Sequence, residues 1–160
     1  DMITKELVSE ILTCIDAVKK ILEQGKKDVL EAFRTRAREA PSIIFANGLA
    51  YTIVYMASRS SAEAVELGLS LRQNTCKGEA LSNLLNNLLN KYTGKEKLSY
   101  ALYISLLSYF LNRATPMDAS EFAAFVDRSL KDPTLERTAL DISEWMKRIA
   151  EALISPIPPE

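Results

Sequence analysis

Residues 40–58 read APSIIFANGLAYTIVYMAS, and this stretch decides the fold class. The pair Asn47-Gly48 stands between two apolar runs, which is a strong short-range signal for a β-hairpin. A hairpin, however, needs apolar residues at every second position, and here they stand side by side on both sides of the pair. The apolar positions recur every three or four residues instead. We therefore predict one mostly buried helix over 41–58, with Pro41 in its first turn and Gly48 at a close helix–helix contact.

Helical spacing also runs through the rest of the chain, which has 160 residues with only five Gly and six Pro. Leu, Ala, Glu and Lys, which favour helices, are abundant. The predicted fold is all-α: a compact bundle of seven or eight helices in a single domain over 1–155, with a flexible Pro-rich tail over 156–160. The predicted helices are 3–22, 28–39, 41–58, 61–72, 79–92, 98–112, 118–130 and 133–153.

The apolar pattern also predicts which side chains form the core. The helix over 98–112 is apolar nearly all round, so we expect it at the centre of the bundle. Phe45 and Leu130 fall on predicted inward stripes. Trp145 stands beside the stripe of the last helix, where a core position is commoner than a surface that stacks on bases. Ser61 and Asp132 precede predicted helices as N-caps, and Pro133 follows the second of them.

Several classes of active site are excluded because the chain contains no histidine. A Ser-His-Asp triad and a Cys-His pair both need that residue, and two Cys without His cannot complete a zinc site of the usual kind. No phosphate-binding glycine motif occurs, and we expect neither a metal nor another cofactor. Asp141 and Glu144 are the best pair of acidic residues, and two carboxylates on an exposed helix usually face water. Cys14 and Cys76 are isolated, which favours two buried, reduced thiols.

The N-terminal residues are amphipathic and charged, unlike a signal peptide. The only stretch without charge that is long enough to suggest a membrane span is 40–58, and its polar residues favour a buried helix instead. We therefore expect a cytoplasmic protein with no membrane partner. Net charge is −1, but residues 19–38 carry seven basic residues against three acidic ones. A nearly neutral total can thus conceal a basic surface.

Two motifs stand out together. The first is the arginine-rich stretch that continues into Pro41-Ser42-Ile43-Ile44-Phe45-Ala46-Asn47-Gly48-Leu49, and the second is Trp145-Met146-Lys147-Arg148. In their order and distance they resemble the small, all-helical subunit of the Cmr complex, the type III-B CRISPR effector. The motifs cover about a tenth of the chain, while the length and the order of helices extend the resemblance loosely over the rest.

The resemblance implies a structural subunit without catalysis of its own. Several copies would stack head to tail in an inner filament of a ribonucleoprotein, beside other Cmr subunits and along the duplex of guide RNA and target RNA. Arginine offers paired donors to phosphate oxygens, so a contact with the RNA backbone is one interpretation of the basic residues. The candidate RNA-binding residues are Arg34, Arg36, Arg38, Lys147, Arg148 and Lys27.

Other interpretations of the same residues stay open at this stage. The arginines of the 28–39 helix could form a solvated face with Glu31 and Glu39 as local partners. Lys147 and Arg148 stand at helical spacing from Glu144 and Glu151, so local ion pairs could occupy them. The alternative function is a helical protein–protein adaptor without nucleic-acid contact. An enzyme with an unfamiliar carboxylate site is a third hypothesis.

Overall fold

The computed structural model describes residues 3–72, 74–156 and 158, and these residues are helical without any strand. Eight α-helices and one short 3-10 helix (η1) follow one another in this part of the chain. The predictions of an all-α fold and of seven or eight helices are therefore confirmed. The elements are α1 (Lys5–Leu22), α2 (Lys27–Asn47), α3 (Leu49–Ser58), α4 (Ala62–Ser70), η1 (Thr75–Lys77), α5 (Glu79–Lys91), α6 (Lys95–Ala114), α7 (Phe122–Lys131) and α8 (Pro133–Leu153).

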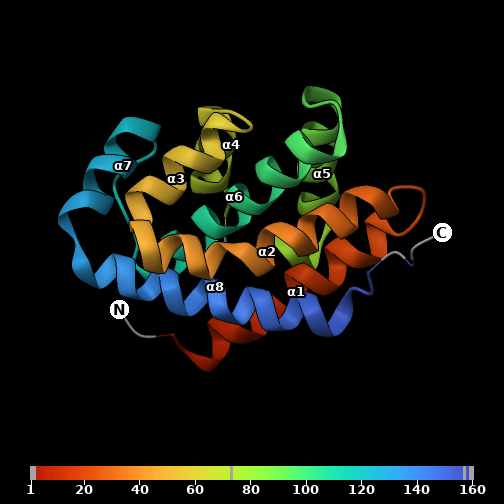
Figure 1. Cartoon of the computed structure of the whole chain (residues 1–160), viewed down its shortest axis with the longest axis horizontal. Coiled ribbons are helices and arrows are strands. Elements are labelled where there is room, and N and C mark those ends of the chain that lie inside the picture. The colour runs from red at the N-terminus through yellow and green to blue at the C-terminus, as the bar shows by residue number, and fades with distance from the viewer. Residues whose placement is uncertain (1–2, 73, 157, 159–160) are drawn as a thin grey trace.

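Helix α6 lies at the centre of the bundle. Every residue from Leu98 to Leu111 is buried, as its nearly continuous apolar sequence predicts. In Figure 1, α2 and α8 lie side by side across the front, and α3, α4 and α7 gather at one end. Helix α4 packs closely on α6 at Gly68. A Cβ added to this residue would lie only 2.1 Å from the carbonyl oxygen of Ser105. Only glycine permits so close an approach at this position.

Local capping signals place several helix ends correctly. The Ser61 side chain accepts a hydrogen bond from the Ala64 amide at 3.3 Å, and α4 begins directly after it. The Asp132 carboxylate accepts from the Leu135 amide at 3.0 Å, with proline at the first position of α8. Helix α7 begins later than predicted, at Phe122, whose amide donates to Glu66 of α4 at 2.9 Å. A contact between distant segments sets that start, so the local sequence does not reveal it.

The stretch 40–58, which decides the fold class, is helical, but it is divided between the end of α2 and the whole of α3 and does not form one helix. Helix α2 continues through Pro41 to Asn47, so Pro41 lies inside a helix and not in its first turn. Buried neighbours such as Ala37 and Ile44 hold this part of α2 in the bundle despite the hydrogen bond that proline cannot donate. The chain then breaks at Gly48, which has a φ of 90°. Glycine adopts a positive φ without the steric cost that a Cβ would bring, and this non-helical conformation separates α2 from α3.

Three predicted core side chains lie at the surface. Phe45 is 82 % exposed and Leu130 is 71 % exposed, against the prediction that both face inward. Trp145 is 45 % exposed, so the expectation of a core position is also wrong. In each case the neighbouring residue along the helix is the buried one, namely Ile44, Ser129 and Met146. Which of two neighbouring residues faces the core depends on the rotation of the helix about its axis. The packing of the whole helix sets that rotation, and a local apolar pair does not specify it.

The two cysteines are joined by a disulfide bond between α1 and η1. Cys14 and Cys76 are both buried, as predicted, but the expectation of reduced thiols is wrong. The residues are 62 positions apart, and folding brings their Cα atoms to 5.0 Å, a spacing suited to a disulfide. Of the predicted tail over 156–160, Pro156 and Pro158 are described and exposed, and the other residues lie outside the described residues.

Candidate functional site

The candidate residues lie mainly on α2 and α8, which run antiparallel. Arg38 of α2 contacts Glu151 near the end of α8, whereas the Leu49 amide, just after α2, contacts Glu136 near the start of α8. The two helices therefore pair along much of their length in opposite directions. This arrangement brings together basic residues that are more than a hundred positions apart in the sequence.

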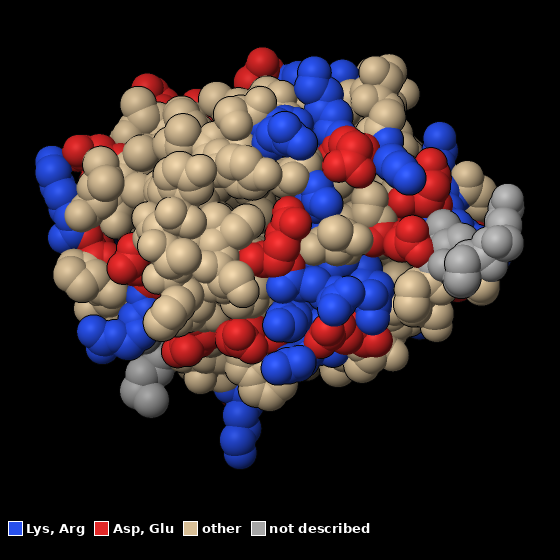
Figure 2. Space-filling model, in the orientation of Figure 1, with Lys and Arg blue, Asp and Glu red and all other residues tan. Residues whose placement is uncertain are grey.

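One carboxylate joins the basic residues of the two helices. Glu151 accepts a hydrogen bond from Arg38 at 3.1 Å and another from Arg148 at 3.2 Å. Burial alone would raise the pKa of Glu151, but Arg148, Lys147 and Arg38 outweigh it and lower that pKa. Because Glu151 carries a single negative charge, it balances only one of the two guanidinium groups. Figure 2 shows Lys and Arg side chains gathered over α2 and α8, with acidic side chains beside them.

We call Arg34, Arg38, Lys147 and Arg148 the α2–α8 cluster. Arg38 and Arg148 are exposed, and Arg34 and Lys147 are half-buried. Arg34 stands one helical turn before Arg38 on the same side of α2, and its Nε is buried without a hydrogen-bond partner in the described part of the chain. The structure thus brings these four predicted residues to one pair of helices.

Arg36 lies on a different side of α2. Its side chain forms ion pairs with Glu39 at 3.2 Å and with Glu96 at 3.3 Å, and its guanidinium stands 4.2 Å from the centre of the Tyr100 ring. The residue is only 7 % exposed. Burial raises the pKa of Glu39, and the positive charge of Arg36 opposes that rise. Arg36 therefore links α2 to α6 and does not join the α2–α8 cluster.

Lys27 is exposed at the beginning of α2, away from the cluster. It borders a hollow of about 580 Å³ together with Lys19, Glu23 and Leu153. Both acidic and basic side chains line this hollow, so it is not a simple anion site. The structure therefore places Lys27 at the edge of the α2–α8 pair.

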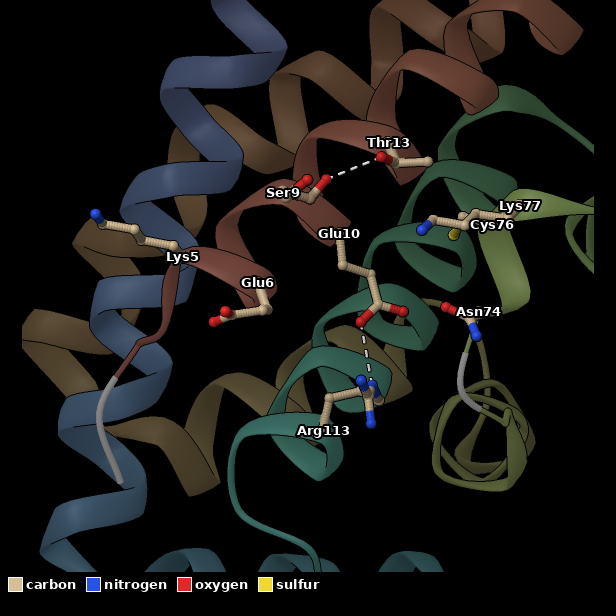
Figure 3. Close-up of a pocket in the computed structure, with 9 residues that line it drawn as sticks. All are labelled: Lys5, Glu6, Ser9, Glu10, Thr13, Asn74, Cys76, Lys77 and Arg113. Atoms are coloured by element: carbon tan, nitrogen blue, oxygen red, sulfur yellow. Dashed lines mark hydrogen bonds and ion pairs between the residues drawn. The ribbon is translucent and has the colours of Figure 1, made fainter.

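Another hollow, of about 390 Å³, opens between α1, η1 and the end of α6. Figure 3 shows Glu10 of α1 and Arg113 of α6 pointing toward each other across it, and their ion pair measures 3.1 Å. Tyr109 donates a second hydrogen bond to Glu10. Within the described residues, no group of three metal-ligating side chains is close enough to hold a metal ion. We interpret this arrangement as a structural polar network.

Sequence reasoning missed two features of this surface. It placed Glu151 beside Arg148 from helical spacing, but it did not find the contact with Arg38, because the two residues lie 113 positions apart. It also assigned Arg36 to the exposed arginines, although that residue borders the apolar stripe of α2. That position beside the apolar stripe was the only signal in the sequence that Arg36 is buried.

The chain matches the family model of the CRISPR-associated protein Cas_Cmr5 over residues 4–153. It belongs to this family. It is accordingly a Cmr5 subunit of the type III-B CRISPR complex, with other Cmr subunits as partners, and the family is generally a non-catalytic structural one. No curated protein and no solved structure matched the chain in the same comparisons. Among the described helices, none has the length and apolar character needed to cross a membrane.

Proposed function

We propose that this Cmr5 subunit is a non-catalytic RNA-binding scaffold whose copies form an inner filament along the duplex of guide RNA and target RNA. The α2–α8 cluster is the observation that carries the RNA-binding part of the proposal. Its guanidinium groups offer paired donors to phosphate oxygens, and one carboxylate leaves part of their charge unbalanced. Such contacts read the backbone, so base pairing between guide and target supplies the sequence specificity.

Within this proposal, Arg34, Arg38, Lys147 and Arg148 contact phosphates, and Lys27 is an outlying contact at the start of α2. For Arg36 we propose a structural role instead, because two carboxylates and the Tyr100 ring already surround it. One cluster contacts few phosphates, so a single copy binds weakly. A row of copies along one duplex would add such contacts and raise the overall affinity.

The test compares two charge-matched double variants of the full chain. Arg38→Gln with Arg148→Gln alters the cluster, whereas Lys20→Gln with Lys131→Gln removes the same charge from α1 and α7. Affinity for an RNA duplex is measured by fluorescence anisotropy at several salt concentrations, and circular dichroism checks the folding of each variant.

Each lost phosphate contact lowers the slope of log affinity against log salt by about 0.7 to 0.9. We expect the cluster variant to reduce that slope by about 1.5 and the control variant to leave it unchanged. A slope that is equal in the wild type and in the cluster variant would favour the protein–protein adaptor instead.

A further inference from the structure

Helix α3 and the residue that follows it carry a row of partly or fully exposed side chains that lies outside the α2–α8 cluster. Tyr51, Tyr55 and Arg59 follow one another at intervals of four residues, so they share one side of the helix. The Tyr51 and Tyr55 rings are parallel within 6°, and their centres are 6.1 Å apart. Tyr51 is 52 % exposed, although an aromatic side chain of this size is commonly buried. We call these three residues the α3 ladder.

The far end of the ladder is held in place by α6. Tyr55 and Tyr100 share a hydrogen bond between their hydroxyl oxygens at 3.2 Å, and their rings meet edge to face. The Arg59 guanidinium stands 5.4 Å from the centre of the Tyr100 ring. In the described part of the chain, Arg59 forms no ion pair with a carboxylate within 4.0 Å, although its charge lowers the pKa of Glu39 against the larger effect of burial. The ladder thus combines one aromatic ring that α6 holds, a second ring stacked beside it and an exposed positive charge.

A groove runs beside Tyr51, between α3 and α7. It has a volume of about 410 Å³, and Val54, Val126 and Leu130 line it with Tyr51. Asn47 supplies an amide at its edge. Figure 2 shows a region without charged side chains over α3, with acidic and basic side chains at the edge near α7. The groove is therefore mostly apolar, with one aromatic wall, and the Glu136 side chain also lines it.

We propose that the α3 ladder binds single-stranded RNA by stacking an unpaired base on Tyr51, while Arg59 contacts a phosphate of the same strand. The two residues lie about 12 Å apart along the helix, so one short strand can reach both. Base stacking on an aromatic ring tolerates any sequence, as a subunit that serves many guides requires. This inference rests on the proposed function, and it adds a base contact to the phosphate contacts of the α2–α8 cluster.

The observations favour RNA over an apolar segment of another protein. A protein segment would fill the apolar groove, but it would need an acidic side chain at the right place to use the cation at the end of the ladder, whereas every nucleotide carries a phosphate. A nucleic acid uses both features, because its bases stack and its phosphates attract Arg59. The ladder also lies near Arg36 of α2, since Arg36 and Arg59 both contact the Tyr100 ring.

The test uses the full chain and two probes of equal length and charge. One is a short oligouridine, and the other is an abasic ribose-phosphate chain that lacks the bases. The variants are Tyr51→Leu, which keeps an apolar side chain, and Tyr51→Phe, which keeps the ring. Phe45→Leu is the matched control, because Phe45 is a more exposed aromatic residue outside the ladder.

We expect Tyr51→Leu to weaken the binding of oligouridine about tenfold, with no change for the abasic chain. Tyr51→Phe and Phe45→Leu should both stay within about twofold of the wild type. The proposal is overturned if Tyr51→Leu binds oligouridine as the wild type does, or if Phe45→Leu causes the same loss.

The two proposals fail in different ways. If both probes bind equally well and depend on Arg38 and Arg148, the proposed function stands and the α3 ladder has no role in RNA binding. If neither single-stranded probe binds while the RNA duplex still binds through Arg38 and Arg148, the inference about the ladder is overturned and the proposed function stands. If the duplex does not bind either, both proposals are overturned. If Tyr51→Leu releases a Cmr subunit from the assembled complex without changing the binding of either probe, the ladder is a protein interface.

Discussion

Removal of the disulfide bond between Cys14 and Cys76 should cost the chain a large part of its stability. The bond closes a loop between residues that are 62 positions apart. The loop-entropy relation gives about 4 kcal/mol for a loop of this length, because the closed loop restricts the unfolded chain. A whole domain is commonly stable by only about 5 to 15 kcal/mol. For a chain of this size, we expect the melting temperature to fall by about 8 to 16 °C.

The assay compares the wild type with a Cys14→Ala/Cys76→Ala double variant by scanning calorimetry, each with and without a thiol reductant. Alanine is preferred because Cys14 is fully buried, and a serine there would place a hydroxyl group in the apolar core. The reduced wild type should melt close to the double variant, and the oxidised wild type should melt well above both. Reductant should not change the melting of the double variant.

Two results would refute this reasoning. Titration of two free thiols in the unfolded chain, without reductant, would show that the bond does not form. If the bond is present and its reduction leaves the melting temperature unchanged, loop closure contributes nothing measurable, and the packing of α1 against η1 alone holds these segments together.

Two further predictions concern packing and pH. Gly68→Ala should lower the free energy of unfolding by about 3 kcal/mol, because the new Cβ would collide with the Ser105 carbonyl, whereas Gly78→Ala, which meets nothing within 4 Å, serves as the control in denaturant titrations. Equal stability of the two variants would contradict the close contact. The pKa values of Asp132 and Glu151 are both lowered. For Asp132 the largest cause is the hydrogen bond from the Leu135 amide, and for Glu151 basic side chains outweigh the effect of burial. The contribution of these two carboxylates to the free energy of unfolding is therefore complete above about pH 5, and it is lost as pH falls through the lowered pKa values. Asp132→Asn keeps a capping oxygen, so its melting temperature should fall less steeply between about pH 4 and pH 2 than that of the wild type, and parallel curves would contradict the assignment.

Local rules recovered the parts of the fold that depend on neighbours in sequence. Ser61 and Asp132 cap helices as expected, and the apolar run after Leu98 becomes the central helix. These signals act within one or two helical turns, so the sequence carries them directly. The same reasoning distinguished a helical stretch from a hairpin around Gly48, although it did not foresee the break.

The features that were missed depend on segments far apart in the chain. The position where a side chain on Gly48 would lie is occupied by Glu136, whose carboxylate accepts from the Leu49 amide at 2.9 Å and so caps α3. The partner of Cys14 and the contact of Arg38 with Glu151 are likewise set by packing. The candidate site was therefore predictable as a set of basic residues, whereas their grouping into a cluster was not.

The antiparallel pairing of α2 with α8 has a consequence for protein synthesis. A ribosome completes α2 long before it completes α8, and the cluster takes its residues from both. A nascent chain that ends before residue 147 has arginines on α2 but lacks Lys147 and Arg148 of α8. The proposed surface is thus complete only after α8 has emerged and docked. Under the proposed function, premature capture of RNA by unfinished chains is thereby disfavoured.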